Sequence, residues 1–249
     1  MAIALVEFTE IALIPALLTA LGSLPVLLFS LRTSGRHLYP IGMGFSAGIM
    51  LVASFTSLLL PALDMGGVVM AIPGLIVGAS TIWVLDRMLP HIHTEDRYEG
   101  PSIRVNLSKM WLVSMAIIIH NIPEGMAVGS AATYSWHDGL SLALAIGIQD
   151  IPEGLAVAIP IALAYGSRIR GFGVGILSGL SEFLAAYIPF LTAFIIPYTL
   201  PLLMAFSAGA MVYVVIHEIT PDVIKDSDRA TLGFFTGFVI MLVLDSISL

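Results

Sequence analysis

Two related hexapeptides place carboxylates, other polar side chains and a proline inside long apolar stretches of the sequence. They read HNIPEG at positions 120–125 and QDIPEG at positions 149–154. An acidic side chain at membrane depth is costly unless a cation, a proton or a hydrogen bond compensates it, so intramembrane acids are functional candidates. We therefore interpret the two hexapeptides as the chemical centre of the molecule.

Helical geometry groups the polar residues of each hexapeptide around its glutamate. His120 and Glu124 are one turn apart on one face, and Asn121 lies on the other flank of Glu124. The second hexapeptide repeats this arrangement with three residues in corresponding places: Gln149, Asp150 and Glu153. If the two faces meet, Glu124 and Glu153 could bridge two adjacent cations.

The proline and glycine of each hexapeptide also contribute to the predicted site. Pro123 and Pro152 lack the N–H that would bond the carbonyl four residues earlier, so we expect both helices to be kinked there. A freed carbonyl at membrane depth needs a cavity, water or an ion. Gly125 and Gly154 would allow the helices to approach closely.

A further acid, Glu182, falls in the middle of another apolar segment. With Glu124, Asp150 and Glu153 it brings the charge to −4, which two divalent cations would neutralise, although protons would also do so. Imidazole, carboxylate and amide donors together suit Zn²⁺ and could equally hold Cd²⁺, Fe²⁺ or Mn²⁺. Ca²⁺ and Mg²⁺ rarely recruit histidine.

Two further groups of residues predict an entrance path and an exit path. Met50, Ser57 and Asp64 are seven residues apart, which on a helix returns nearly to the same stripe every two turns, and Asp64 lies at the outer end. A carboxylate at the mouth would attract cations. On the cytoplasmic side, the candidates for an exit path are His217, Glu218, His91 and His93.

Composition indicates an all-α integral membrane protein. Hydrophobic residues make up 58% of the 249 residues, charged residues make up 11%, and the mean hydropathy is +0.99, whereas soluble domains have about 25% charged residues. A spanning helix needs about 20 apolar residues. The sequence predicts eight such helices in one domain, 1–249, at roughly 8–31, 38–63, 67–88, 106–133, 139–165, 171–197, 200–220 and 231–249.

The cations predict the orientation of these helices. All ten basic residues fall in alternate connections: Arg32, Arg36, Arg87, Arg97, Arg104, Lys109, Arg168, Arg170, Lys225 and Arg229. The positive-inside rule therefore puts both termini outside the cytoplasm and makes the polar loop at about 90–104, which we expect to be mobile, cytoplasmic. The net charge of −7 gives no indication of nucleic-acid binding. The hexapeptides lie 29 residues apart on consecutive, antiparallel helices, as in the inverted repeats of transporters.

With eight spans, outer termini, a histidine-bearing cytoplasmic loop and two Pro-Glu-Gly motifs, the whole chain resembles the ZIP (Zrt/Irt-like) family of divalent metal transporters, particularly its bacterial GufA-like branch. The resemblance implies one metal at His120, Glu124, Gln149 and Glu153, with Met50 approaching. It implies a second metal at Asn121, Asp150 and Glu182, which shares the two glutamates. It also matches Ser57 and Asp64 to the outer entrance and His217 and Glu218 to the inner exit, and it suggests a homodimer.

The function expected from these features is transport of Zn²⁺ or a similar ion into the cytoplasm, across the cell membrane, by alternating access. Small residues around 42–53 would permit helices to slide. A metal-selective channel with the same ligands is the first alternative. An intramembrane metalloenzyme is disfavoured, because the candidate zinc motif at His217 has Pro221 where a second histidine is needed. A membrane sensor would need an output domain, and we identify none in the sequence.

Overall fold

The computed structural model describes residues 4–28, 35–88, 91–92, 98–99, 109–223 and 227–248. In these parts the chain is helical apart from two short strands. The α-helices are α1 (Leu5–Ser23), α2 (Pro25–Leu28), α3 (Gly35–Ala53), α4 (Leu60–Met88), α5 (Lys109–Tyr134), α6 (Trp136–Tyr165), α7 (Arg168–Ile195), α8 (Leu200–Val214), α9 (Thr220–Val223) and α10 (Ser227–Ser248). Two π-helical turns, η1 (Ser54–Leu59) and η3 (Val215–Ile219), and the 3₁₀ turn η2 (Pro197–Thr199) lie between them.

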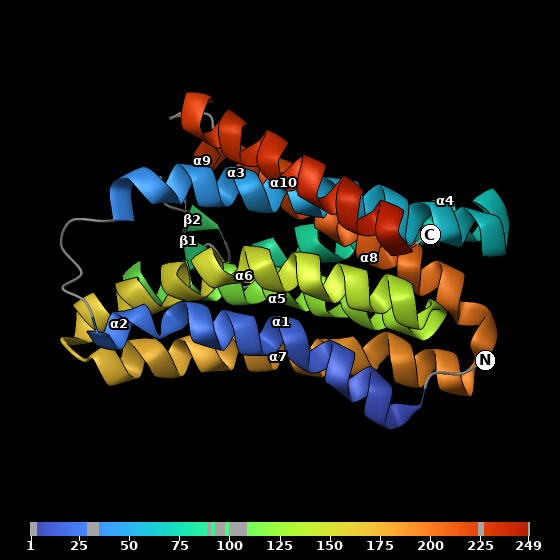
Figure 1. Cartoon of the computed structure of the whole chain (residues 1–249), viewed down its shortest axis with the longest axis horizontal. Helices are drawn as coiled ribbons and strands as arrows, with labels where there is room; N and C mark the ends of the chain where they lie inside the picture. Colours follow the sequence, from blue (N-terminus) through green and yellow to red (C-terminus); the bar gives the residue numbers. More distant parts are fainter. Residues whose placement is uncertain are drawn as a thin grey trace.

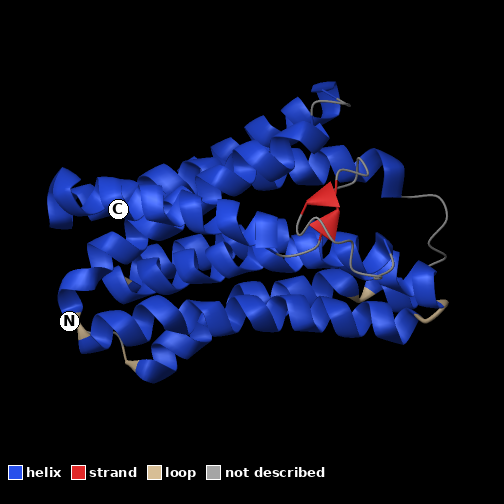
Figure 2. Cartoon of the chain, turned by 180° about the vertical axis from the view of Figure 1, so that it is seen from behind, coloured by secondary structure: helices blue, strands red, loops and turns tan. Residues whose placement is uncertain are grey.

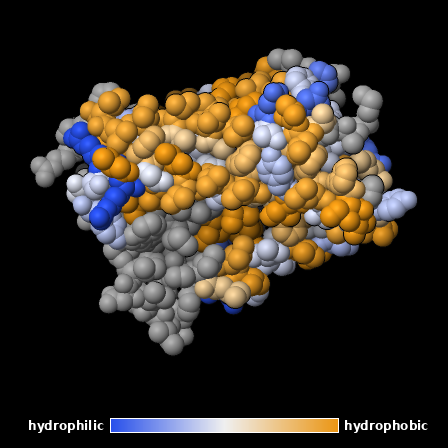
Figure 3. All heavy atoms as spheres, turned by 90° about the horizontal axis from the view of Figure 1, so that it is seen from below, coloured by the Kyte–Doolittle hydropathy of each residue, from blue (hydrophilic) through white to orange (hydrophobic). Residues whose placement is uncertain are grey.

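Six helical stretches of the described residues are long and apolar enough to cross a membrane. One of them, Pro40–Met88, is 49 residues long and covers most of the predicted span 38–63 and all of the predicted span 67–88. Gly67 divides it with a left-handed φ of 61°, a conformation that glycine adopts without a Cβ penalty. Figure 3 shows an apolar belt around the middle of one face, with hydrophilic atoms towards both ends. The chain is a multi-pass, all-α membrane protein.

The helices pack in two groups (Figure 1). The first group contains α1, α5, α6 and α7, which pack against one another. In the second group α3 packs along α10 and α4 packs along α8, and the continuous run through η1 joins the two pairs. The groups meet where α3 and α10 contact α6 and where α8 contacts α5.

Both chain ends lie at the same end of the bundle: α1 begins and α10 ends there (Figure 1). Toward the other end lies a small antiparallel hairpin, which Figure 2 shows in red. Its strands are β1 (His91–Ile92) and β2 (Tyr98–Glu99), with His91 opposite Glu99. The polar segment that the sequence predicted to be a mobile loop thus contains regular structure, and β1 packs against α5.

A tight connection makes α6 and α7 antiparallel neighbours. The helix α6 ends at Gly166, whose φ of 57° is left-handed. The next residue, Ser167, caps the start of α7 by accepting a hydrogen bond from the backbone N–H of Arg170 at 3.4 Å.

The small residues of α3 do not all lie where the sliding hypothesis needs them. A Cβ on Gly44 would lie 2.1 Å from the carbonyl oxygen of Ala230, and one on Gly48 would lie 2.2 Å from that of Phe234. Both glycines therefore seat α3 tightly against α10 within the second group. Gly42, by contrast, faces Pro152 across the boundary between the groups. Sequence alone could not tell which neighbouring helix each glycine contacts.

Candidate metal site

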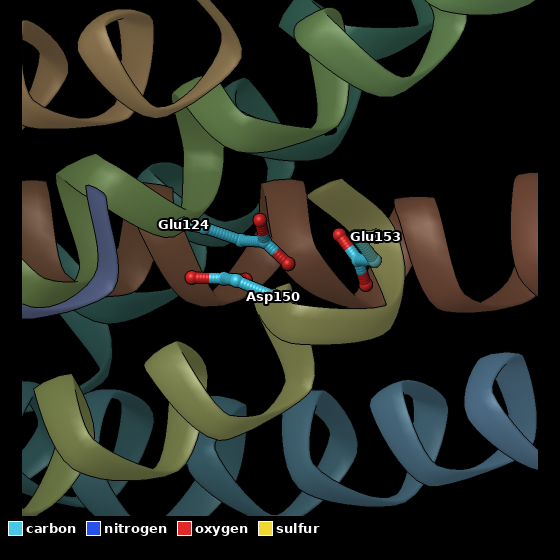
Figure 4. A group of neighbouring side chains, drawn as sticks. All are labelled: Glu124, Asp150 and Glu153. Carbon is cyan, nitrogen blue, oxygen red and sulfur yellow. The ribbon is translucent and has the colours of Figure 1, made fainter. Parts of the chain in front are cut away.

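Three carboxylates from two helices converge in the interior of the first group. Glu124 comes from near the middle of α5, and Asp150 and Glu153 come from near the middle of α6. One carboxylate oxygen from each lies within 4.8 Å of the other two, and all three side chains are buried. Figure 4 shows the Glu124 carboxylate between those of Asp150 and Glu153. This spacing is suited to a shared cation, because oxygen and nitrogen ligands lie about 2.0–2.2 Å from Zn²⁺.

Other polar side chains surround this carboxylate cluster. The side-chain Nε2 of Gln149 donates a hydrogen bond to Glu124 Oε1 at 2.5 Å. His120 lies close enough to Glu153 to interact electrostatically, and the Glu182 carboxyl on α7 faces that of Asp150. The structure thus gathers residues of both hexapeptides and Glu182 around one point.

Many polar atoms here are buried without a hydrogen-bond partner. Such atoms occur at five predicted ligands: Asn121, Glu124, Gln149, Asp150 and Glu182. Buried polar atoms in proteins are nearly always hydrogen bonded, and leaving one unpaired costs about 1–3 kcal/mol. A cation among these oxygens would satisfy them, so the donor set of the described residues fits a divalent metal.

The glycines of the hexapeptides position the site. A Cβ on Gly125 would lie 2.0 Å from the backbone oxygen of Glu182, and a Cβ on Gly154 would lie 2.0 Å from that of Thr19. The absence of a side chain therefore lets α5 meet α7, and α6 meet α1, at the level of the carboxylates. The helices α5 and α6 continue through Pro123 and Pro152.

Sequence reasoning missed two hydroxyl groups at the site. Thr19 on α1 is 1% exposed, and its Oγ1 lies 3.2 Å from Glu182 Oε2. Ser46 on α3 is fully buried beside Glu153, although its hydroxyl forms no hydrogen bond of good geometry. A hydroxyl in an apolar helix is a weak signal, because it commonly bonds its own helix.

The predicted entrance residues differ in their exposure. Met50 and Ser57 are buried, whereas Asp64 is exposed. The π-helical turn η1 lies between Met50 and Asp64 and contains Ser57, so the spacing of these residues is not that of a regular α-helix. The Ser57 hydroxyl lies 3.2 Å from Asp245 Oδ1, which gives a contact to an acid that had no role in the sequence analysis.

The predicted exit residues are only partly described. His217 lies in η3, and its ring packs against Tyr213 with centroids 4.9 Å apart. The backbone of Glu218 belongs to the same π-helical turn, and the backbone of His91 belongs to β1. His93 lies outside the described residues.

Comparison with known proteins gives consistent matches. Residues 98–245 match the family model described as ZIP Zinc transporter. The chain is 40% identical over 244 residues to zinc transporter ZIPB of Bordetella bronchiseptica, an alignment that covers 92% of this chain and 77% of the relative. It is 32% identical to zinc transporter GufA of Myxococcus xanthus, over 91% and 93% of the two chains. It is 30% identical to human zinc transporter ZIP11, over 92% and 93%.

Proposed function

The chain belongs to the ZIP family of zinc transporters, and we propose that it carries Zn²⁺ into the cytoplasm through the carboxylate cluster between α5, α6 and α7. As a member of this family it is a transporter and not an enzyme. The observation that carries the proposal is the convergence of Glu124, Asp150 and Glu153 within 4.8 Å, with all three side chains buried near the middle of α5 and α6. Cd²⁺, Fe²⁺ and Mn²⁺ are candidate substrates of the same site.

The site is proposed to hold two ions. One would bind His120, Glu124, Gln149 and Glu153, with Met50 approaching from α3. The other would bind Asn121, Asp150 and Glu182 and share the two glutamates. Four acids around two divalent ions balance in charge, and the electrostatic interaction between the Glu182 and Asp150 carboxyls supports the second position.

The proposed topology has eight spans in a cell membrane. Gly67 separates the second span from the third, and both termini lie on the side of the membrane opposite the cytoplasm. The positions of the chain ends at one end of the bundle and of the hairpin at the other support it (Figure 1). Ions would enter past Asp64 and Ser57 and leave past His217, Glu218, His91 and His93. A homodimer also belongs to the proposal.

The proposed motion is alternating access, in which the first group moves relative to the second. In support, the glycines at which an added Cβ would overlap a neighbouring backbone join helices of the same group, such as Gly48 with α10 and Gly125 with α7. Close backbone packing of this kind makes each group rigid. A metal-selective channel remains the alternative, and it predicts uptake that rises with zinc concentration without saturating.

The experiment that tests the proposal is uptake of radioactive Zn²⁺ and Cd²⁺ into proteoliposomes. Wild type should show saturable uptake, and Glu124→Ala and His120→Ala should abolish it or reduce it severely. Thr192→Val is the control, since the Thr192 hydroxyl bonds Ile188 within α7. Unchanged uptake in both site variants would refute the site. Import predicts that cells expressing the chain accumulate zinc, and a loss of cellular zinc would contradict it.

A further inference from the structure

We propose that Thr19 is a positioning residue of the metal site, which holds one oxygen of Glu182 and so presents the other oxygen to the metal. The inference rests on the proposed function and adds the α1 helix to the site. It starts from a contact between two buried side chains: Thr19 is 1% exposed and Glu182 is fully buried. Thr19 Oγ1 lies 3.2 Å from Glu182 Oε2, and the buried Oε1 has no hydrogen-bond partner among the described residues.

The Thr19 hydroxyl has two acceptors but only one proton. It lies 2.9 Å from the backbone oxygen of Pro15 in its own helix and 3.2 Å from Glu182. A hydroxyl donates one hydrogen bond at a time. When Glu182 is ionised, as it would be with a metal bound, the bond to the carboxylate is charge-assisted and is therefore the stronger of the two. Thr19 then fixes the rotation of the carboxylate.

Thr19 and Glu182 occupy equivalent positions, because the glycine of one hexapeptide packs against the backbone of each. Gly125 of the first hexapeptide packs α5 against the backbone of Glu182 on α7. In the same way, Gly154 of the second hexapeptide packs α6 against the backbone of Thr19 on α1. The contacts extend by one helical turn in both pairs of helices. Gly129, four residues after Gly125, lies against Ala186, and Gly154 also lies against Ser23, four residues after Thr19.

The two hexapeptides therefore face an acid on α7 and a hydroxyl on α1. Since Glu182 lies against Asp150, the acid and the hydroxyl that holds it serve the second metal position. We infer that zinc binding at the second position depends on Thr19, and so on α1, whereas zinc binding at the first position does not.

A threonine that only bonds its own helix provides the comparison. Thr133 on α5 donates to the backbone oxygen of Gly129 at 2.6 Å. Thr133→Val removes a hydroxyl of the same kind as Thr19→Val, without touching a carboxylate of the site. Valine has nearly the shape of threonine, so both variants preserve the packing volume.

The test is zinc binding to the full-length protein in detergent, measured by equilibrium dialysis. Thr19→Val should weaken the binding of one of the two zinc ions about tenfold, the effect of losing one hydrogen bond to a charged group, and should leave the binding of the other ion unchanged. Thr19→Ser should bind like wild type, because it keeps the hydroxyl. Thr133→Val should also bind like wild type.

A double-mutant cycle with Glu182→Gln separates positioning from general destabilisation. If Thr19 acts through Glu182, Thr19→Val should have little further effect on zinc binding in the Glu182→Gln background. An equal loss in both backgrounds would overturn the inference. So would wild-type binding by Thr19→Val, or an equal weakening by Thr19→Val and Thr133→Val.

These outcomes are distinct from failure of the proposed function. A wild-type protein that binds zinc without taking it up into proteoliposomes would contradict transport, and the Thr19 comparison would still be decided by binding. A wild-type protein that transports zinc while Thr19→Val binds normally would overturn only the role of Thr19. Absence of zinc binding by wild type would overturn both.

Discussion

At the scale of the residue, the defining feature is the number of buried oxygens that lack a hydrogen-bond partner. Gln149 illustrates the arrangement, because its Nε2 donates to Glu124 while its buried Oε1 has no hydrogen-bond partner. The amide thus fixes one glutamate oxygen and offers its own oxygen to a metal. Without a cation the neighbouring carboxyl groups must take up protons or repel one another, and they lack solvation. The metal-free site is therefore destabilising, and binding a metal relieves the cost.

Replacing Asp150 with asparagine should affect zinc binding and stability in opposite directions. The variant loses a predicted ligand of the second metal, so we expect fewer bound zinc ions per chain and slower uptake. It also removes a buried negative charge, so the metal-free protein should gain on the order of 1 kcal/mol in stability. Metal content and thermal unfolding in detergent measure the two effects.

The matched control for this prediction is Asp228→Asn, which removes an exposed acid in the first turn of α10 and should change neither zinc binding nor stability substantially. If Asp150→Asn kept both its metal content and its uptake, the two-metal arrangement would be wrong.

The sequence contained most of the site at this scale, but not all of it. The spacing of His120 with Glu124, and of Gln149 with Glu153, follows from helical geometry alone. Which acids share a site depends on how α5, α6 and α7 pack, and that is a tertiary property. Thr19 could not be recognised, since its contact to Glu182 joins residues 163 positions apart and a lone threonine on an apolar helix carries no distinguishing pattern.

At the scale of the element, glycines and π-helical turns decide where side chains lie. The sequence located most helices to within a few residues, because apolar runs of sufficient length have few alternatives in a membrane. It did not predict η1 or η3, because hydrophobic periodicity assumes regular α-helix. These turns contain Ser57 and His217, which are predicted to line the two ends of the path. The departures from regular helix therefore coincide with candidate functional positions, as π-helical turns often do.

Adding a methyl group at Gly125 should be costly. Gly125→Ala would place a Cβ 2.0 Å from the Glu182 backbone oxygen, so α5 and α7 would have to separate. We expect a loss of about 1–3 kcal/mol in stability, typical of overpacking, together with weakened zinc binding.

Gly173→Ala is the control for that prediction, because a Cβ at Gly173 meets nothing within 4 Å. It should be neutral or stabilising by up to about 1 kcal/mol, as expected for glycine to alanine in a helix. Equal thermal stability of the Gly125 and Gly173 variants would show that close helix contact does not position the site.

Gly67 should be required for the break between the second and third predicted spans. With φ 61° and ψ −175°, Gly67 has a backbone conformation that is essentially restricted to glycine and that costs other residues about 1–3 kcal/mol, so Gly67→Ala should lower the free energy of unfolding by about that amount. A Cβ there meets no atom within 4 Å, so the effect would come from the backbone alone. A variant as stable as wild type would mean that Gly67 does not hold this conformation in the membrane.

At the scale of the whole molecule, the helices form two packed groups, and the proposed transport motion is a movement of one group relative to the other. Hydropathy and charge could predict a single membrane domain with paired termini, but not which helices form a unit. Gly44 and Gly48 illustrate this limit of the sequence. They were expected to let helices slide, but they pack α3 closely against α10. The carboxylate cluster lies within the first group, and residues such as Ser46 approach it from the second. Movement between the groups would change the surroundings of the metal without separating Glu124 from Glu153.

Covalently joining the two groups should therefore stop transport. The Ser141 hydroxyl on α6 donates to the backbone oxygen of Leu244 on α10 at 3.0 Å, across the boundary. The chain has no cysteine, so Ser141→Cys with Leu244→Cys can be joined by a short, reducible thiol cross-linker. Zinc uptake should fall on cross-linking and return on reduction, while either single cysteine variant should be unaffected. Full uptake in the cross-linked protein would contradict relative movement of the groups.

The central claim is that the carboxylates of α5 and α6 bind the zinc that the protein transports. Anomalous X-ray diffraction at the zinc edge, from crystals of the full chain grown with Zn²⁺, tests it most directly. We expect anomalous peaks between Glu124, Asp150 and Glu153, and we expect Glu124→Gln to abolish them. Zinc bound only elsewhere, with the carboxylate cluster empty in a protein that takes up zinc, would contradict it.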